Sequence, residues 1–115
     1  EIGAEPMICV NFGSGTPEEA AAWVEYCNGP ADSRYGALRA ANGHAAPYGV
    51  KYWDIGNEAF AEWEIGHCDA DAYCEKFQQF ATAMRQIDSD IKLIACGGDG
   101  NSSDQSWNET LCQHL

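Results

Sequence analysis

The sequence is poor in basic residues. It has 6 Lys and Arg against 18 Asp and Glu among its 115 residues, for a formal net charge of −12. Such a chain repels nucleic-acid phosphates and anionic lipid headgroups, so we expect neither nucleic-acid nor membrane partners. No window approaches the roughly 18 consecutive apolar residues of a membrane span. The first six residues lack the basic-then-apolar plan of a signal peptide.

With 45% apolar residues, including four Trp, five Tyr and four Phe, the chain is too apolar for a disordered acidic tail, so we expect a globular domain.

The six cysteines leave two interpretations open. They could form three disulfide bridges in a small carbohydrate-binding module, in which Trp53 and Trp63 would contact the sugar, or they could remain free thiols. Small disulfide scaffolds are usually shorter, denser in cysteine and poorer in regular helix than this chain. The composition therefore favours free thiols.

Three apolar stretches are typical of strands that are buried on both faces, as in a parallel sheet. They span residues 7–12, 50–55 and 91–96.

Two helices are predicted between these strands. The first has Thr16 and Glu19 at capping-box spacing and ends before Gly29 and Pro30, and the second has Asp69 as its N-cap. The apolar residues expected to face inward are Ala20, Trp23, Val24 and Cys27 in the first helix, and Tyr73, Phe77, Phe80, Ala81, Met84 and Ile87 in the second.

The order of these elements indicates an α/β fold with parallel strands. Residues 31–49 have no sustained period, and we expect a long connection or a loop with one irregular turn there. Three strands and two helices cannot cover both faces of such a sheet, and a complete parallel barrel needs about 250 residues. We therefore expect residues 1–115 to be a partial (β/α)8 barrel domain that is truncated at both ends.

The carboxyl ends of parallel strands lie on one side of a sheet, where active sites form. Only the second predicted strand is followed at once by an ionisable residue, in the run Gly56-Asn57-Glu58. A carboxyl buried there would act as a proton donor and acceptor, and the amide of Asn57 suits a sugar hydroxyl. The alternative is that Asn57 and Glu58 merely begin a helix in a βα loop.

An ordered series of motifs resembles the α-L-arabinofuranosidases of glycoside hydrolase family 51. The similarity covers about residues 5–98 and is carried by residues 6–16, 23–29, 39–44 and 47–58, followed by Trp63 and by Gly66-His67. It implies a (β/α)8 TIM barrel, of which this chain holds roughly strands three to five with the intervening helices.

The resemblance also implies an activity and residue roles. The family hydrolyses terminal α-L-arabinofuranosyl residues of arabinose-containing oligo- and polysaccharides with retention of configuration. Glu58 corresponds to its general acid/base, Asn57 to the residue that binds the sugar 2-hydroxyl, and Trp63 to a Trp near the cleft that could stack on a sugar. The same barrel can host endoglucanase or β-xylosidase activity, which remain alternatives.

A retaining mechanism needs a second carboxyl roughly 5–5.5 Å from the first. In the family this nucleophile is a Glu at the end of strand seven, so we expect it outside the chain and expect the chain alone to be inactive. Glu62 and Glu64 are poor candidates, because they lie in the loop just after Glu58. For the longer protein of which this chain would be a segment, the resemblance favours a bacterial cytoplasmic location over secretion and allows a homo-oligomeric state.

No motif predicts a cofactor or a metal. Gly13-Ser14-Gly15 follows a strand, but Glu18 stands where a dinucleotide-binding loop needs its third glycine. Residues 67–71 include His67, Cys68 and Asp69 but lack the paired spacing of a zinc site, and a helix cap is the simpler interpretation.

Overall fold

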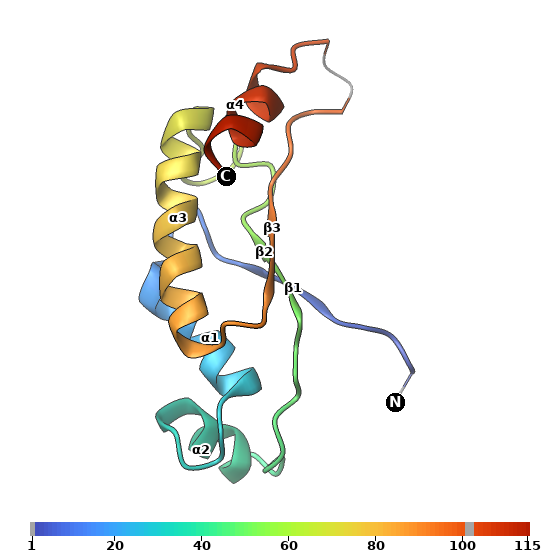
Figure 1. The fold of residues 1–115 in the computed structure, drawn as a ribbon, viewed down its shortest axis with the longest axis vertical. Helices are drawn as coiled ribbons and strands as arrows, with labels where there is room; N and C mark the ends of the chain where they lie inside the picture. Colours follow the sequence, from blue (N-terminus) through green and yellow to red (C-terminus); the bar gives the residue numbers. More distant parts are fainter. Residues whose placement is uncertain (1, 101–102) are drawn as a thin grey trace.

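The computed structural model describes residues 2–100 and 103–115 as an alternation of strands and helices (Figure 1). The elements are β1 (Met7–Val10), α1 (Pro17–Asn28), α2 (Arg34–Ala41), β2 (Tyr52–Ile55), α3 (Ala70–Ile87), β3 (Lys92–Ala95) and α4 (Ser106–His114). All three predicted strands are present, each shorter than its apolar stretch. Both predicted helices are present, with Thr16 and Asp69 as their N-caps.

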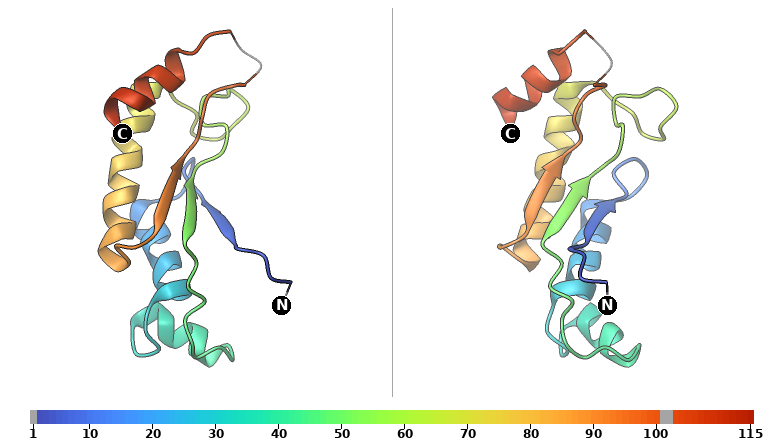
Figure 2. Two further views of the ribbon diagram at one scale, coloured as in Figure 1. Left: turned by 45° about the vertical axis from the view of Figure 1, so that its right-hand side comes forward. Right: turned by 90° about the vertical axis from the view of Figure 1, so that its right-hand side faces the viewer.

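The strands form a parallel sheet in the order β1-β2-β3. Cys9, Asp54 and Ile94 lie at the same level in the register, and so do Ile8, Trp53 and Leu93. Figure 2 shows the helices on one side of this sheet. The opposite face carries exposed side chains, among them Met7 at 62% and Tyr52 at 41% of their full exposure. The predicted α/β class is therefore confirmed, with one face of the sheet covered.

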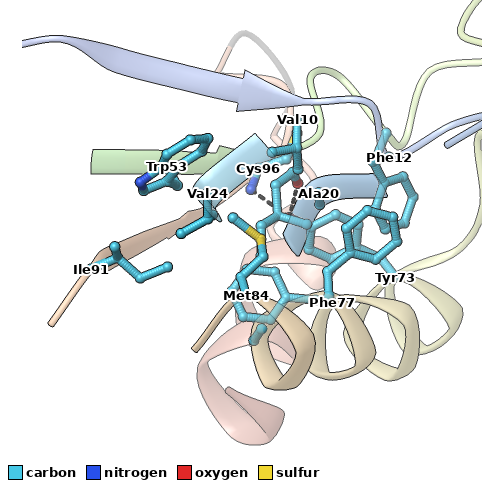
Figure 3. Close-up of a cluster of buried hydrophobic side chains, with 14 of the residues drawn as sticks. Val10, Phe12, Ala20, Val24, Trp53, Tyr73, Phe77, Met84, Ile91 and Cys96 are labelled. Atoms are coloured by element: carbon cyan, nitrogen blue, oxygen red, sulfur yellow. Dashed lines mark hydrogen bonds between the residues drawn. The ribbon is translucent and has the colours of Figure 1, made fainter. Parts of the chain in front are cut away.

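The core lies between the sheet and α1 and α3 (Figure 3). On α3 the predicted apolar face is buried from Tyr73 to Met84, but Ile87 is 42% exposed because it is the last residue of the helix. On α1, Ala20, Val24 and Cys27 are buried as predicted, whereas Trp23 is 44% exposed. The ring of Trp23 packs edge-on against Trp53 with 6.1 Å between centroids, so it lies at the border of the core.

Helix α2 corrects the prediction of a loop over residues 31–49. Ser33 caps it by accepting a hydrogen bond from the Gly36 N–H at 3.2 Å. Gly36, which suggested a break in the sequence, is instead required inside the helix, because a Cβ there would overlap the carbonyl oxygen of Pro30. The helix is short and carries few apolar residues, so it has no clear periodicity.

Helix α4 was not predicted either. The Asp104 carboxylate accepts a hydrogen bond from the N–H of the first residue of the helix, Ser106, at 2.9 Å, and Leu111 is its only buried residue. It is tied to the end of β3 by two hydrogen bonds, from the Trp107 indole to the Cys96 carbonyl at 2.9 Å and from the Gly98 N–H to the Asn108 side chain at 2.8 Å. Its position thus depends on tertiary contacts rather than on its own pattern.

Arg39 of α2 is the one charged residue that is fully buried among those described. Its guanidinium donates hydrogen bonds only to backbone carbonyls. The acceptors are Tyr26 at 2.8 Å, His44 and Ala45 at 3.0 Å each, and Cys27 at 3.4 Å. Two of these carbonyls belong to the last turn of α1, where a helix has unpaired carbonyls and a partial negative charge. Arg39 therefore joins the end of α1 to the loop that leads into β2.

All six cysteines are free in the structure. The three bridges of the disulfide-module alternative are therefore not formed, and the preference for free thiols is confirmed. Cys27, Cys74 and Cys96 are buried, and burial raises the pKa of each of these thiols.

Tyr73 links the carboxyl ends of two strands to α3. Its hydroxyl donates to the Ile55 carbonyl and accepts from the Cys96 N–H, each at 2.7 Å. Burial raises the pKa of this phenol, so it stays protonated at neutral pH and keeps both bonds.

We expect Tyr73→Phe to lower the free energy of unfolding by about 1–3 kcal/mol, because it leaves a buried carbonyl and a buried N–H without their partner. Urea unfolding of the purified protein measures this. Tyr48→Phe, at an exposed ring, is the matched control and should change the free energy by less than about 0.5 kcal/mol. Equal effects of the two variants would contradict the role given to the Tyr73 hydroxyl.

Candidate functional site

A cleft of about 400 Å³ lies at the carboxyl ends of β1 and β2. One side is formed by the turn after β1, from Asn11 to Ser14, and the other by Gly56, Asn57 and the loop that contains Trp63. Asn57 and Trp63 therefore both line this cleft, whereas Glu58 is not among its lining residues. The residues after β3 do not line it, so two of the three expected strand ends form this site.

A larger hollow of about 660 Å³ lies between α1 and α3, lined mostly by polar side chains such as Glu18, Glu75 and Gln79. We place the candidate site in the smaller cleft, because the carboxyl ends of parallel strands are where α/β folds bind their substrates.

The turn after β1 is held by hydrogen bonds within the turn and by a hydrogen bond from helix α3. The Asn11 side chain accepts from the Ser14 N–H at 3.2 Å and donates to the Ser14 hydroxyl at 3.1 Å. Lys76 of α3 donates to the Phe12 carbonyl at 2.6 Å, and its Nζ lies 4.3 Å from the centroid of the Phe12 ring. Nothing in the local sequence links Lys76 to this turn, so its contact there was not predicted.

Two glycines bring the turn after β1 against the loop after Glu58. A Cβ on Gly13 would overlap the carbonyl oxygen of Ile65, and a Cβ on Gly66 would overlap the carbonyl oxygen of Gly13. Gly66 also has φ +75°, which favours glycine. Both sides of the cleft are therefore in direct backbone contact.

Glu58 has a backbone conformation that is rare for its residue type. Its φ is +46°, the one positive φ among the described residues other than glycine. Such left-handed geometry costs a non-glycine residue roughly 1–2 kcal/mol, and such outliers cluster at functional sites. Glu58 is exposed in the described structure, so the prediction of a buried carboxyl at this position is wrong.

Trp63 donates a hydrogen bond from its indole Nε1 to Oε2 of Glu58 at 2.9 Å. The ring is 75% exposed, so its faces remain open to a ligand. The structure therefore brings together the three residues that the sequence singled out, with Asn57 next in the chain to Glu58 and Trp63 bonded to it.

Asp54 lies on the exposed face of the sheet, beside Cys9. Its Oδ1 is buried, and within the described part of the chain it has no hydrogen-bond partner. Burial raises the pKa of this carboxyl, while hydrogen bonds from the Ile55 backbone and from Cys9 oppose the shift. Asp54 was not predicted as a site residue, because nothing in the sequence of β2 indicates that a carboxyl would be desolvated there.

The two acidic residues after Glu58 differ in position. Glu64 lines the cleft, whereas Glu62 is exposed and does not. Asp69 accepts a hydrogen bond from the Ala72 N–H at 2.9 Å, which confirms the helix-cap interpretation of this segment. Within residues 2–100 and 103–115, no group of three or more His, Cys, Asp or Glu side chains is placed to hold a metal ion. Among the helices described, none has the length and apolar character of a membrane span.

Comparisons with known proteins agree on one family. A sequence profile described as "Alpha-L-arabinofuranosidase 1 domain" matches residues 1–115. A probable α-L-arabinofuranosidase C from Aspergillus clavatus is 44% identical over 98% of this chain and 22% of the relative. An enzyme from Streptomyces lividans, named an intracellular exo-α-(1→5)-L-arabinofuranosidase, is 40% identical over 94% of this chain and 17% of the relative.

Solved structures give the same result. The GH51 α-L-arabinofuranosidase from Thermotoga petrophila superposes with a TM-score of 0.90 at 45% identity, over 99% of this chain and 23% of that protein. The family 51 enzyme AbfB from Bifidobacterium longum superposes with a TM-score of 0.90 at 32% identity, over 97% and 23%. The chain thus spans about a fifth of the length of the relatives it matches.

Proposed function

We propose, from the premise that the chain belongs to the GH51 α-L-arabinofuranosidase family, that it is part of a retaining enzyme that removes terminal α-L-arabinofuranosyl residues from oligo- and polysaccharides. We call the longer protein of which it would be a segment the parent enzyme. In this proposal Glu58 is the general acid/base and no cofactor takes part.

One observation carries this proposal. Glu58 stands at the carboxyl end of β2 in left-handed backbone geometry, beside a cleft that Asn57 and Trp63 line. A carboxyl in this position can protonate the oxygen of a departing sugar or aglycone. After the leaving group has gone, the same carboxylate accepts a proton from the attacking water.

The second carboxyl of the reaction lies, in our proposal, outside the 115 residues. A retaining mechanism requires it roughly 5–5.5 Å from the first, to attack the anomeric carbon. Glu64 lines the cleft, but its backbone takes part in two consecutive turns of the loop, with its N–H bonded to Ala61 at 2.9 Å and its carbonyl to His67 at 3.2 Å. We therefore assign the nucleophile to another segment, and expect the chain alone to be inactive.

Asn57 and Trp63 are the proposed substrate-binding residues. The exposed amide of Asn57 can both donate to and accept from a sugar hydroxyl, and the exposed faces of the Trp63 ring can stack on a sugar. A neutral arabinose polymer needs no charge complementarity, which fits the net charge of −12.

We further propose that the chain forms roughly strands three to five of a (β/α)8 barrel that is continued by other segments. The sheet has helices on one face and exposed apolar side chains on the other, as expected if the open face lines a barrel interior. The name of the Streptomyces lividans relative supports a cytoplasmic location for the parent enzyme. A homo-oligomeric state stays a prediction.

The test is a substrate panel with the purified parent enzyme. We expect kcat/KM for 4-nitrophenyl α-L-arabinofuranoside to exceed that for the β-D-xyloside by about 10²-fold or more, since the cleft would be shaped for the furanose ring. Proton NMR of the first product should show arabinose with the configuration of the substrate. Faster hydrolysis of the xyloside or of β-glucan would instead support the β-xylosidase or endoglucanase alternative, and an inverted product would overturn the retaining mechanism.

A further inference from the structure

We propose that Trp63 is a positioning residue for Glu58, whose indole N–H holds Oε2 so that the transferable proton is carried by Oε1. This inference rests on the proposed function, because it concerns how Glu58 would act as the acid/base. It gives Trp63 a role beyond stacking on a sugar.

The hydrogen bond fixes which carboxyl oxygen takes the proton. Trp63 Nε1 lies 2.9 Å from Oε2 of Glu58, and an indole N–H can donate but never accept. A proton on Oε2 would turn this oxygen into a hydroxyl, which is a weaker acceptor than the carbonyl oxygen of the acid, so the contact favours the proton on Oε1. Oε1 is left to carry the proton.

The same bond acts differently in the two steps of the reaction: it stabilises the carboxylate that forms in the first step, and it positions Oε1 in the second. In the first step, the O–H bond at Oε1 breaks, the proton forms a new O–H bond with the glycosidic oxygen, and the C–O bond to the leaving group breaks as the nucleophile attacks the anomeric carbon. Glu58 becomes a carboxylate during this step, and an N–H donor binds a carboxylate more strongly than a neutral acid. Trp63 thus stabilises charge that develops in the transition state. In the second step, a water oxygen bonds to the anomeric carbon, the C–O bond to the nucleophile breaks, and Oε1 accepts the proton that the water loses.

The loop between Glu58 and Cys68 is built to hold this contact. Its backbone closes through hydrogen bonds from Ala61 to the Glu58 carbonyl at 2.7 Å and from Cys68 to the Ala59 carbonyl at 3.0 Å. Ala59 and Ala61 are buried, and Gly66 packs on Gly13. The loop is therefore held at both ends and by the contact of Gly66 with Gly13. This backbone path places the Trp63 indole against Glu58, the residue at which the loop begins.

Substitutions can separate the two proposed contributions of Trp63, stacking by its ring face and hydrogen bonding by its N–H. The N–H edge is occupied by Glu58, whereas the ring is 75% exposed and its faces stay available to a sugar. Trp63→Phe keeps an aromatic face and removes the donor. Trp63→3-benzothienylalanine keeps the whole bicyclic shape and removes only the N–H.

The experiment uses the parent enzyme and a series of aryl α-L-arabinofuranosides whose phenols differ in acidity. Poor leaving groups need protonation, whereas very good ones depart without it. For Trp63→Phe we expect kcat/KM to fall by about 10–30-fold with poor leaving groups, as for loss of one charge-assisted hydrogen bond, and by less than about 3-fold with 2,4-dinitrophenol. The benzothienyl variant should behave in the same way.

Trp23→Phe is the matched control, since Trp23 is a partly exposed Trp of α1 that makes an edge contact with Trp53. It should leave kcat/KM unchanged for every leaving group. A loss that is equal for all leaving groups in Trp63→Phe, or no loss at all, would overturn the inference and leave Trp63 with a sugar-binding or structural role.

Failure of the proposed function gives a different result. If Glu58→Ala itself shows no dependence on the leaving group, Glu58 is not the acid/base. If Glu58→Ala shows that dependence while both Trp63 variants do not, only the present inference fails.

Discussion

Glu58→Ala in the parent enzyme is expected to lower kcat/KM on natural, unactivated arabinosides by about 10²–10⁴-fold, the usual contribution of a general acid or base. The loss follows from the mechanism. Without the carboxyl at the end of β2, the departing oxygen leaves as an unprotonated alkoxide. Substrates with very good leaving groups should still form the glycosyl-enzyme at nearly the normal rate, because their phenolates are stable without a proton.

The second step should be slowed as well, because no carboxylate then activates the water. Azide needs no deprotonation, so it should restore turnover of activated substrates to Glu58→Ala and give a glycosyl azide that retains the configuration of the substrate. Steady-state rates with and without azide measure this. Glu62→Ala is the matched control, since Glu62 is an exposed carboxyl outside the cleft, and its activity should match that of the wild type. A Glu58→Ala enzyme with a normal rate on natural substrate would refute the role of Glu58.

The largest effect on stability is expected at Arg39. Arg39→Met keeps an apolar stem but removes the donors that satisfy four backbone carbonyls, two of them at the end of α1. A buried carbonyl left without its donor costs about 1–3 kcal/mol, and because several are affected we expect the free energy of unfolding to fall by about 3–5 kcal/mol. Arg39→Lys should recover only part of it, because one ammonium cannot reach carbonyls on two segments in the way a planar guanidinium does.

Denaturant unfolding of the parent enzyme measures this loss. The control is Arg34→Met, since Arg34 is an exposed arginine of the same helix whose guanidinium lies 5.0 Å from the Tyr35 ring, and it should change stability by less than about 0.5 kcal/mol. Folded Arg39→Met should keep most of its activity, because Arg39 lies at the end of the sheet away from the cleft. A stability near that of the wild type would show that water can replace the guanidinium.

The parts of the fold that were predictable are those with a local signal. Helix α3 buries a continuous apolar face from Tyr73 to Met84, so its periodicity alone revealed it. Helix α2 has no such face. Two residues hold it in place. Gly36 allows a close contact with the backbone of Pro30, and Arg39 is fully buried. The sequence does not show the carbonyls that accept from Arg39, so its charge would have predicted an exposed position.

The candidate site divides in the same way. Glu58, Asn57 and Trp63 stand close together in the chain, and a strand followed by a short loop was enough to bring Asn57 and Trp63 into one cleft with Glu58 beside it. Lys76 reaches the Phe12 carbonyl across 64 positions of sequence, and no local pattern encodes such a contact. The exposure of Glu58 was mispredicted because burial depends on which segments pack over the cleft, and the run Gly56-Asn57-Glu58 does not specify that.

The left-handed backbone of Glu58 bears on how inactive forms of the enzyme are best made for crystallography. Alanine at this position inherits the unfavourable φ of +46° and loses the contact to Trp63, whereas glutamine inherits the same φ but keeps an oxygen that can accept from the indole. Glycine adopts this conformation freely and asparagine does so more readily than most residues. Glu58→Gly and Glu58→Asn are therefore the replacements that would trap an intact sugar chain in the cleft with the least displacement of the loop around it.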